Sequence, residues 1–218
     1  MQPDFWHERW RKGQTAFHQT AVDRHLAQHW ATLQVPAGGR VFVPLCGKSL
    51  DLLWLRTHGH SVVGVELSAL ALESLCMENG IPAKRRQVDD FEVYEAEGLE
   101  LYCGDFFALT PALLGSVSAV YDRAALIAWP PEMRADYVAH ISALTASGTQ
   151  TLLITLEYPQ SQMSGPPFSV TADEVRRLYA RDHAIQQLSR DDILAAEPRL
   201  RSRGLNELHE ISFRLTRL

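Results

Sequence analysis

The chain has 218 residues, of which 46% are hydrophobic and 22% are charged, and its formal net charge is -5. This composition predicts one sizeable globular core, and the excess of acidic over basic residues argues against nucleic acid or an anionic membrane as a partner. No apolar stretch is long enough to span a bilayer and no signal peptide is visible, so we expect a cytoplasmic protein. The three cysteines lack metal-ligand spacing, so we expect no metal ion.

The N-terminal region is predicted to form an aromatic arm followed by an amphipathic helix. Aromatic residues stand among charged ones over residues 1–17, without a regular period. Over residues 18–33, apolar residues recur at helical spacing, and Pro36 and the two glycines that follow end the pattern. We therefore assign residues 1–34 to an N-terminal arm and helix, and residues 40–218 to the body of the protein.

The body is predicted to be one doubly wound α/β domain. Its first two strands, residues 41–45 and 62–67, alternate with two helices, residues 48–57 and 68–78, and this alternation favours a parallel sheet. Ser68 is the expected N-cap of the second helix. Further strands are predicted at residues 91–95, 99–105, 119–122, 151–158, 185–188 and 210–218, and further helices at residues 131–146 and 173–181.

The turn after the first strand, Pro44-Leu45-Cys46-Gly47-Lys48, is the first candidate ligand site. It holds a single glycine, whereas a dinucleotide pyrophosphate requires several so that backbone N–H groups can approach the phosphates. The P-loop pattern fails as well. A nucleoside ligand without phosphates fits this turn better, and S-adenosylmethionine is the common one. The alternative is an ordinary strand-to-helix turn.

Glu66 ends the second predicted strand, about 20 residues after this turn. At that place a carboxylate can accept hydrogen bonds from both hydroxyls of a ribose. The alternative is an acid stabilised by the dipole of the following helix. The spacing favours the ribose role.

Later strand ends carry further candidates. Asp105 lies where the adenine amino group would sit in this fold, and the neighbouring Phe106 can supply a ring face. Asp122 and Arg123 directly follow an apolar strand. A surface ion pair is one explanation, but this position favours a cleft, in which Arg123 could bind the ligand's carboxylate or the substrate.

Seven blocks of sequence, in the same order, closely resemble the bacterial thiopurine S-methyltransferases. They are Trp6-His-Glu-Arg-Trp10, Gly13-Gln-Thr-Ala-Phe-His-Gln19, Val43-Pro-Leu-Cys-Gly-Lys48, Val62-Val-Gly-Val-Glu66, Gly104-Asp-Phe-Phe107, Tyr121-Asp-Arg-Ala124 and Gly165-Pro-Pro-Phe168. The resemblance runs nearly end to end. It implies a class I methyltransferase fold with one mostly parallel, seven-stranded sheet, an N-terminal helical lid, and S-adenosylmethionine as cofactor, with S-adenosylhomocysteine as product.

The resemblance also implies roles for individual residues. Its motifs place cofactor contacts at Trp10, Leu45, Glu66 and Arg123. The segment from Trp6 to Phe17 would form a lid over cofactor and substrate, with Phe17 on the substrate side, and Trp6 and Trp10 can bury the cofactor.

The implied reaction is methyl transfer to the sulfur of aromatic or heterocyclic thiols such as thiopurines. Such thiols are acidic enough to need no strong general base; Asp122, or a water that it holds, is the candidate base, and Arg123 can favour the thiolate. Arg199 can line the substrate entrance, although a solvated charged loop is the ordinary explanation.

Two alternatives stay open. One is a methyltransferase for selenium or tellurium compounds, small thiols or halide. The other, from a different class, is a non-enzymatic module that binds S-adenosylmethionine and regulates a partner. In either case we expect a small-molecule ligand and a monomeric chain.

Overall fold

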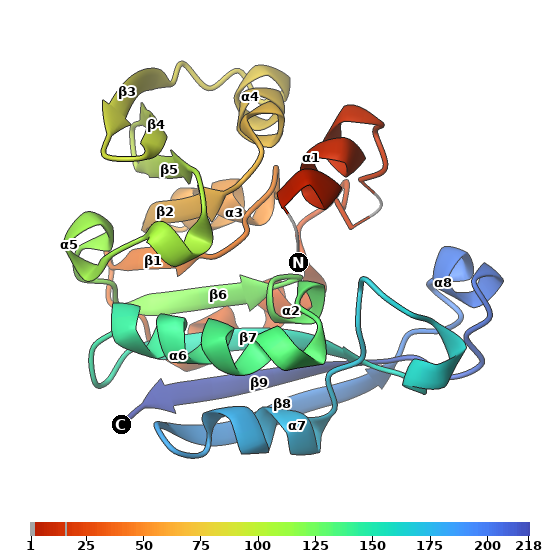
Figure 1. Cartoon of the computed structure of the whole chain (residues 1–218). Helices are drawn as coiled ribbons and strands as arrows, with labels where there is room; N and C mark the ends of the chain where they lie inside the picture. The colour runs from red at the N-terminus through yellow and green to blue at the C-terminus, as the bar shows by residue number, and fades with distance from the viewer. Residues whose placement is uncertain (1–2, 16) are drawn as a thin grey trace. The chain divides into compact units, whose positions relative to one another are not determined.

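A computed structural model describes residues 3–15 and 17–218 of the chain (Figure 1). The chain divides into two compact units, Met1–Tyr121 and Asp122–Leu218, which are described separately. The described residues include nine strands, one more than the eight ranges predicted and two more than the seven-stranded sheet that the resemblance implies. The predicted arm includes residues 1, 2 and 16, which lie outside the described part.

The first unit is built on six strands in the order β3-β4-β5-β2-β1-β6. The central four are parallel, and β3 and β4 form an antiparallel hairpin pair at the β5 edge. Their bounds are β1 (Arg40–Val43), β2 (Ser61–Glu66), β3 (Lys84–Val88), β4 (Phe91–Ala96), β5 (Leu99–Cys103) and β6 (Ala119–Arg123). Phe42, Val63 and Leu101, from the central strands, are fully buried and form part of the core.

The helices of the first unit are α1 (Pro3–Arg11), α2 (Arg24–His29), η1 (Trp30–Leu33), α3 (Asp51–Thr57), α4 (Ala69–Glu78), η2 (Phe106–Ala108) and α5 (Pro111–Leu114). α1 contacts α4, and both stand beside the carboxyl-terminal turns of the central strands (Figure 1). The predicted helix over residues 18–33 begins only at Arg24, because Asp23 caps it: its carboxylate accepts hydrogen bonds from the backbone N–H groups of His25 and Leu26.

The second unit holds three antiparallel strands in the order β7-β9-β8. Their bounds are β7 (Gln150–Glu157), β8 (His183–Asp192) and β9 (His209–Arg217). The helices are η3 (Leu126–Ala128), η4 (Pro131–Met133), α6 (Arg134–Leu144), η5 (Gln160–Gln162), α7 (Ala172–Tyr179) and α8 (Pro198–Ser202). α6 and α7 contact each other and lie side by side (Figure 1).

The prediction of a parallel α/β sheet is confirmed for the central strands, but the predicted number of seven strands is wrong. β3 is not among the predicted strands, because its residues Lys-Arg-Arg-Gln-Val are mostly exposed at a sheet edge and show no apolar alternation. The alternating strands predicted on either side of Gly98 suggest a hairpin, and β4 and β5 form it. The last two predicted strands suggest an antiparallel pair, which β8 and β9 form. Ser68 occupies the predicted N-cap of α4, although its side chain makes no capping hydrogen bond.

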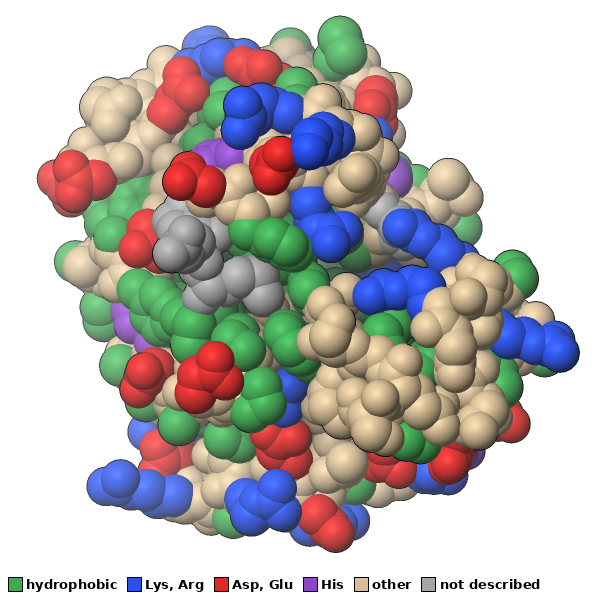
Figure 2. Space-filling view, turned by 45° about the vertical axis from the view of Figure 1, so that its right-hand side comes forward, with side chains coloured by type: hydrophobic (Ala, Val, Ile, Leu, Met, Phe, Trp, Pro, Cys, Tyr) green, Lys and Arg blue, Asp and Glu red, His purple; other side chains and the backbone are tan. Residues whose placement is uncertain are grey.

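Acidic and basic side chains are intermixed on the face shown in Figure 2, which agrees with the small net charge of the sequence. Among the described residues, no helix has both the length and the apolar character that crossing a membrane would require.

Candidate active site

The turn after β1 adopts an unusual backbone that neighbouring residues hold in place. Leu45 has a φ of 48° and Gly47 a φ of 54°, both in the left-handed region. For a non-glycine residue such as Leu45 this conformation costs on the order of 1–3 kcal/mol and persists only where the surroundings fix it. The Cys46 N–H donates to the Val65 carbonyl at 3.0 Å. The end of β2 therefore shapes this turn.

Glu66 makes the second connection between β2 and the turn. Its side chain is 7% exposed. Oε2 accepts a hydrogen bond from the Gly47 N–H at 2.9 Å, and Oε1 accepts one from the Ser68 N–H at 2.8 Å. Burial raises the pKa of Glu66, and these backbone N–H donors partly oppose that rise.

The Glu66 carboxylate can accept the hydrogen bonds that a nucleoside ligand would donate. A carboxylate oxygen has two lone pairs, so each Glu66 oxygen can accept a further hydrogen bond besides the one from the backbone. The carboxylate stands at the carboxyl end of a parallel strand, where open α/β sheets bind their ligands. These residues can therefore hold the two hydroxyls of a ribose.

α1 brings an aromatic cluster onto the turn. A Cβ built at Gly47 would lie 3.3 Å from Cζ2 of Trp10, which is 6% exposed. The Phe17 ring meets Trp10 and Trp6 edge to face, with centroid distances of 5.4 and 5.7 Å. We call Trp6, Trp10 and Phe17 the aromatic cluster. Within the first unit, the aromatic cluster therefore lies against the turn that Glu66 holds.

Cys46 is part of the core. Its thiol is buried, and burial together with the Glu66 carboxylate keeps its pKa well above the ordinary value. Gly64 makes room for it, because a Cβ there would lie 2.8 Å from the Cys46 sulfur. A thiol in this environment is poorly suited to act as a nucleophile.

Asp105 and Phe106 follow β5, which runs parallel to β2 with Cys103 opposite Glu66. The Gly104 N–H donates to the Glu66 carbonyl at 2.9 Å, so this loop lies next to the end of β2. Asp105 is exposed and caps η2 by accepting from the Phe107 N–H, while Phe106 is 4% exposed. Their contacts with adenine stay predictions.

Asp122, in the second unit, is a buried carboxylate with a hydrogen bond to each oxygen. It is 1% exposed; Oδ1 accepts from the Leu126 N–H at 3.2 Å and Oδ2 from the Tyr137 hydroxyl at 2.7 Å. Burial raises its pKa to about 6. These bonds span Ala124, whose φ of 62° is left-handed. They favour a role in holding the β6–η3 turn, and the role of Asp122 as a base stays a prediction.

Arg123 is half-buried and acts electrostatically on Glu197, a residue that the sequence analysis did not single out. Burial and the nearby Glu210 raise the pKa of Glu197, whereas Arg123 and Arg199 lower it. Arg123 therefore shares an acidic neighbour with Arg199, which is exposed on α8. No periodic pattern or spacing in the sequence indicates this grouping.

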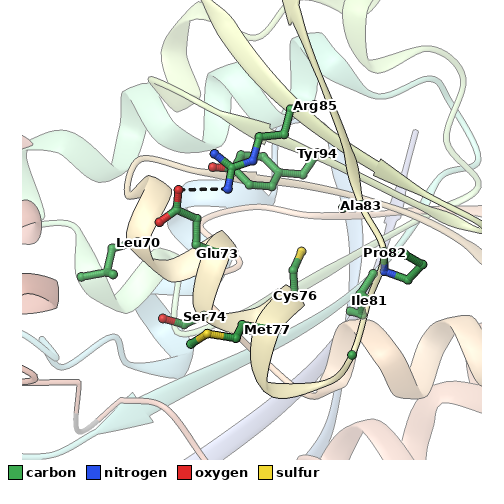
Figure 3. Close-up of a pocket in the computed structure, with 11 residues that line it drawn as sticks. Leu70, Glu73, Ser74, Cys76, Met77, Ile81, Pro82, Ala83, Arg85 and Tyr94 are labelled. Carbon is green, nitrogen blue, oxygen red and sulfur yellow. Dashed lines mark ion pairs between the residues drawn. The ribbon is translucent and has the colours of Figure 1, made fainter.

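A separate cavity of about 640 Å³ lies between α4 and the β3–β4 hairpin (Figure 3). Arg85 pairs with Glu73 at 3.0 Å and stacks on the Tyr94 ring at 4.6 Å from its centroid. None of the predicted site residues lines this cavity.

Comparison with known proteins identifies the family. The family model described as thiopurine S-methyltransferase (TPMT) matches residues 1–218. The chain belongs to the thiopurine S-methyltransferase family. A thiopurine S-methyltransferase of Bordetella petrii is 48% identical over 217 residues, which cover 100% of this chain and 99% of the relative. One of Methylococcus capsulatus is 49% identical over 214 residues, covering 98% and 96%.

Solved structures similar to this family member include S-adenosylmethionine-dependent methyltransferases. The 1,6-didemethyltoxoflavin-N1-methyltransferase of Burkholderia thailandensis, with S-adenosylhomocysteine bound, has a TM-score of 0.65 at 16% identity and covers 98% of this chain and 87% of its own. A Thiobacillus denitrificans methyltransferase in complex with S-adenosylhomocysteine has a TM-score of 0.64 at 14% identity, with coverages of 97% and 98%. These likenesses confirm the predicted fold.

Proposed function

We propose that this protein transfers the methyl group of S-adenosylmethionine to the sulfur of aromatic or heterocyclic thiols, thiopurines among them. The observation that carries the proposal is the buried Glu66 carboxylate, which holds the Gly47 turn beneath the aromatic cluster. The match of the family model along the whole chain supports the same activity.

The proposed cofactor contacts divide by chemistry. When bound, S-adenosylmethionine supplies an activated methyl group on a positively charged sulfur. We assign the ribose hydroxyls to Glu66 and the adenine to Asp105 and Phe106. Trp10 and Leu45 would pack against the cofactor, and an aromatic face near a desolvated cation contributes up to about 2 kcal/mol.

The chain's own contribution to the reaction is positioning and exclusion of water. Aligning two reactants can lower a barrier by on the order of 7–11 kcal/mol. The aromatic cluster is suited to this task, because Trp6 and Phe17 are only half-buried and can still cover a ligand. We assign Phe17 and Arg199 to the substrate side. Arg123 would stabilise a thiolate, so that no strong general base is needed.

The finer assignments rest on the sequence. We propose that the protein acts in the cytoplasm, as a monomer, on small molecules and without a metal ion. The excess of acidic residues supports a small-molecule ligand over nucleic acid or a membrane. The lack of metal-ligand spacing among the cysteines supports a reaction without a metal ion. Methylation of selenium or tellurium compounds is a further proposed activity, on the ground of the family resemblance.

The test is calorimetric titration of the protein with S-adenosylhomocysteine, followed by turnover assays. We expect binding by the wild type, loss of detectable binding in Glu66→Ala, and unchanged binding in Glu97→Ala, which removes an exposed glutamate. We also expect turnover of 6-mercaptopurine and thiophenol to exceed that of selenite and iodide. Absence of heat with the wild type would refute the proposal, and binding without any turnover would favour the regulatory module.

A further inference from the structure

Asp51 is a buried carboxylate that joins three elements of the first unit. It is the first residue of α3 and is 1% exposed. Oδ1 accepts the backbone N–H of Asp23 at 2.8 Å, and Oδ2 accepts the hydroxyl of Tyr121 at 2.9 Å. Tyr121 belongs to β6, and Asp23 is the N-cap of α2. A buried charge is tolerated only when hydrogen-bonded, so both donors matter at this position.

The segment of residues 11–22 connects α1 to α2, and each of its ends is attached. Trp10 packs on Gly47 just before the segment begins. Asp23, just after the segment ends, is 2% exposed, and its backbone N–H is held by Asp51. Residues 11–14 between these attachments are exposed. We call residues 11–22 the linking segment; residue 16 is not described.

Both attachments lie on one short stretch of chain. Gly47 and Asp51 both follow β1 and lie within one five-residue stretch, and the Asp51 N–H donates to Ser49 Oγ at 3.2 Å. The stretch that supplies the candidate cofactor turn therefore also fixes both ends of the linking segment. That segment carries Phe17, whose ring contacts Trp10. Releasing one end would increase the number of conformations open to Phe17.

We propose that Asp51 is a positioning residue: by holding the Asp23 backbone it keeps Phe17 and Trp10 over the Gly47 turn. The inference rests on the proposed function, which gives these aromatic rings contact with cofactor and substrate. Asp51 acts through Asp23 and needs no contact with the ligand.

The first test compares Asp51→Ala with Asp51→Asn. Alanine removes both acceptors. Asparagine keeps them in a different form, since its amide oxygen can accept the Asp23 N–H and its NH₂ can donate to the Tyr121 oxygen. In Asp51→Ala we expect hydrogen exchange in residues 4–22 to be about tenfold faster, and S-adenosylhomocysteine to bind about tenfold more weakly. A factor of about ten corresponds to the free energy of one lost hydrogen bond to a charged group. In Asp51→Asn both should stay close to the wild type.

The matched control is Tyr121→Phe, which breaks the other hydrogen bond of Asp51 and leaves the Asp23 N–H in place. A general loosening of the unit would accelerate exchange in residues 4–22 equally in Tyr121→Phe and Asp51→Ala. Positioning predicts acceleration in Asp51→Ala alone. Equal acceleration in the two variants, or wild-type exchange in a folded Asp51→Ala, would overturn the inference.

A second pair of variants covers the case in which Asp51→Ala does not fold. The φ of Asp23 is -62°, a value that proline adopts. Asp23→Pro and Asp23→Ala both remove the carboxylate that caps α2, but only proline removes the N–H that Asp51 accepts. We expect about tenfold faster exchange of the linking segment in Asp23→Pro than in Asp23→Ala. Equal exchange would refute the inference, whereas a wild type that binds no S-adenosylhomocysteine would refute the proposed function and leave this comparison intact.

Discussion

At the scale of single residues, the site depends on two left-handed turns whose backbone a buried carboxylate holds in place. Leu45 and Ala124 both have left-handed φ values, and each belongs to the turn after a central strand. In each turn a neighbouring carboxylate accepts a backbone N–H: Glu66 from Gly47, and Asp122 from Leu126. Glu66, predicted as a ribose contact, and Asp122, predicted as a candidate base, therefore also support the backbone, so replacing either one removes support for its turn.

Gly47→Ala tests the contact between the turn and the aromatic cluster. The left-handed φ of 54° costs an alanine about 1 kcal/mol, and its Cβ would lie 3.3 Å from the Trp10 ring. We expect a melting temperature lower by about 2–4 °C and an affinity for S-adenosylhomocysteine lower by about tenfold. Thermal unfolding and calorimetric titration measure the two effects.

Gly80→Ala is the control for this substitution. Gly80 has a similar φ of 61°, but a Cβ there would meet nothing within 4 Å. It should lose similar stability and keep its affinity for S-adenosylhomocysteine. If both variants bind like the wild type, Trp10 does not couple the turn to the ligand.

At the scale of elements, prediction succeeded where strands are buried and failed at sheet edges. Residues 62–67 were predicted as a strand, and β2 occupies Ser61–Glu66, because a buried parallel strand is apolar on both faces. The strand predicted at residues 185–188 is longer in the structure, where β8 spans His183–Asp192, because the polar residues around the predicted range show no alternation. The predicted helix from residue 48 starts at Asp51, because the preceding residues form the turn that Glu66 holds.

The candidate site was predictable in part for the same reason. Motif order and strand ends point to Glu66 without any knowledge of contacts. The bond from Gly47 to Glu66 requires the parallel register of β1 and β2, in which Val43 lies opposite Gly64. The bonds of Asp51 join residues 28 and 70 positions apart. No local pattern encodes such distant pairs, so they emerge only from the folded chain.

The β6–η3 turn gives a prediction on pH. Because burial raises the pKa of Asp122 from 3.8 to about 6, its carboxyl contributes stability that is fully present below pH 3.8 and is lost as the pH rises through about 6. In Asp122→Asn this titration is absent, while Leu126 and Tyr137 keep hydrogen-bond partners. Relative to the variant, the wild type should lose roughly 1 kcal/mol of unfolding free energy between pH 5 and pH 7, and about 3 kcal/mol over the whole range.

Urea unfolding at each pH measures this difference. Asp136→Asn, on the exposed side of α6, is the control and should parallel the wild type at every pH. A difference between wild type and Asp122→Asn that does not change with pH would show that Asp122 keeps an ordinary pKa.

At the scale of the whole molecule, the family could be named from sequence because its motifs are spread over the entire chain, from Trp6 to Phe168. The division into two compact units after Tyr121 could not be predicted from the sequence. It falls inside β6, a mostly buried strand with no linker composition, so nothing in the residue pattern marks it. We predict that residues 1–218 form one domain, which means that the two compact units unfold together in one cooperative step. The positions of the residues alone do not measure this cooperativity.

Native-state hydrogen exchange tests that cooperativity. If the chain unfolds as one domain, the slowest amides of β2 and of β7, one strand from each unit, exchange through the same global opening and report the same free energy. S-adenosylhomocysteine at 100 times its Kd should then raise both by about 2.7 kcal/mol, even though the Glu66 contact lies in the first unit. In Glu66→Ala neither value should rise. A ligand-dependent rise in β2 alone would mean that the units unfold independently, because a ligand stabilises only those residues whose opening also opens its site.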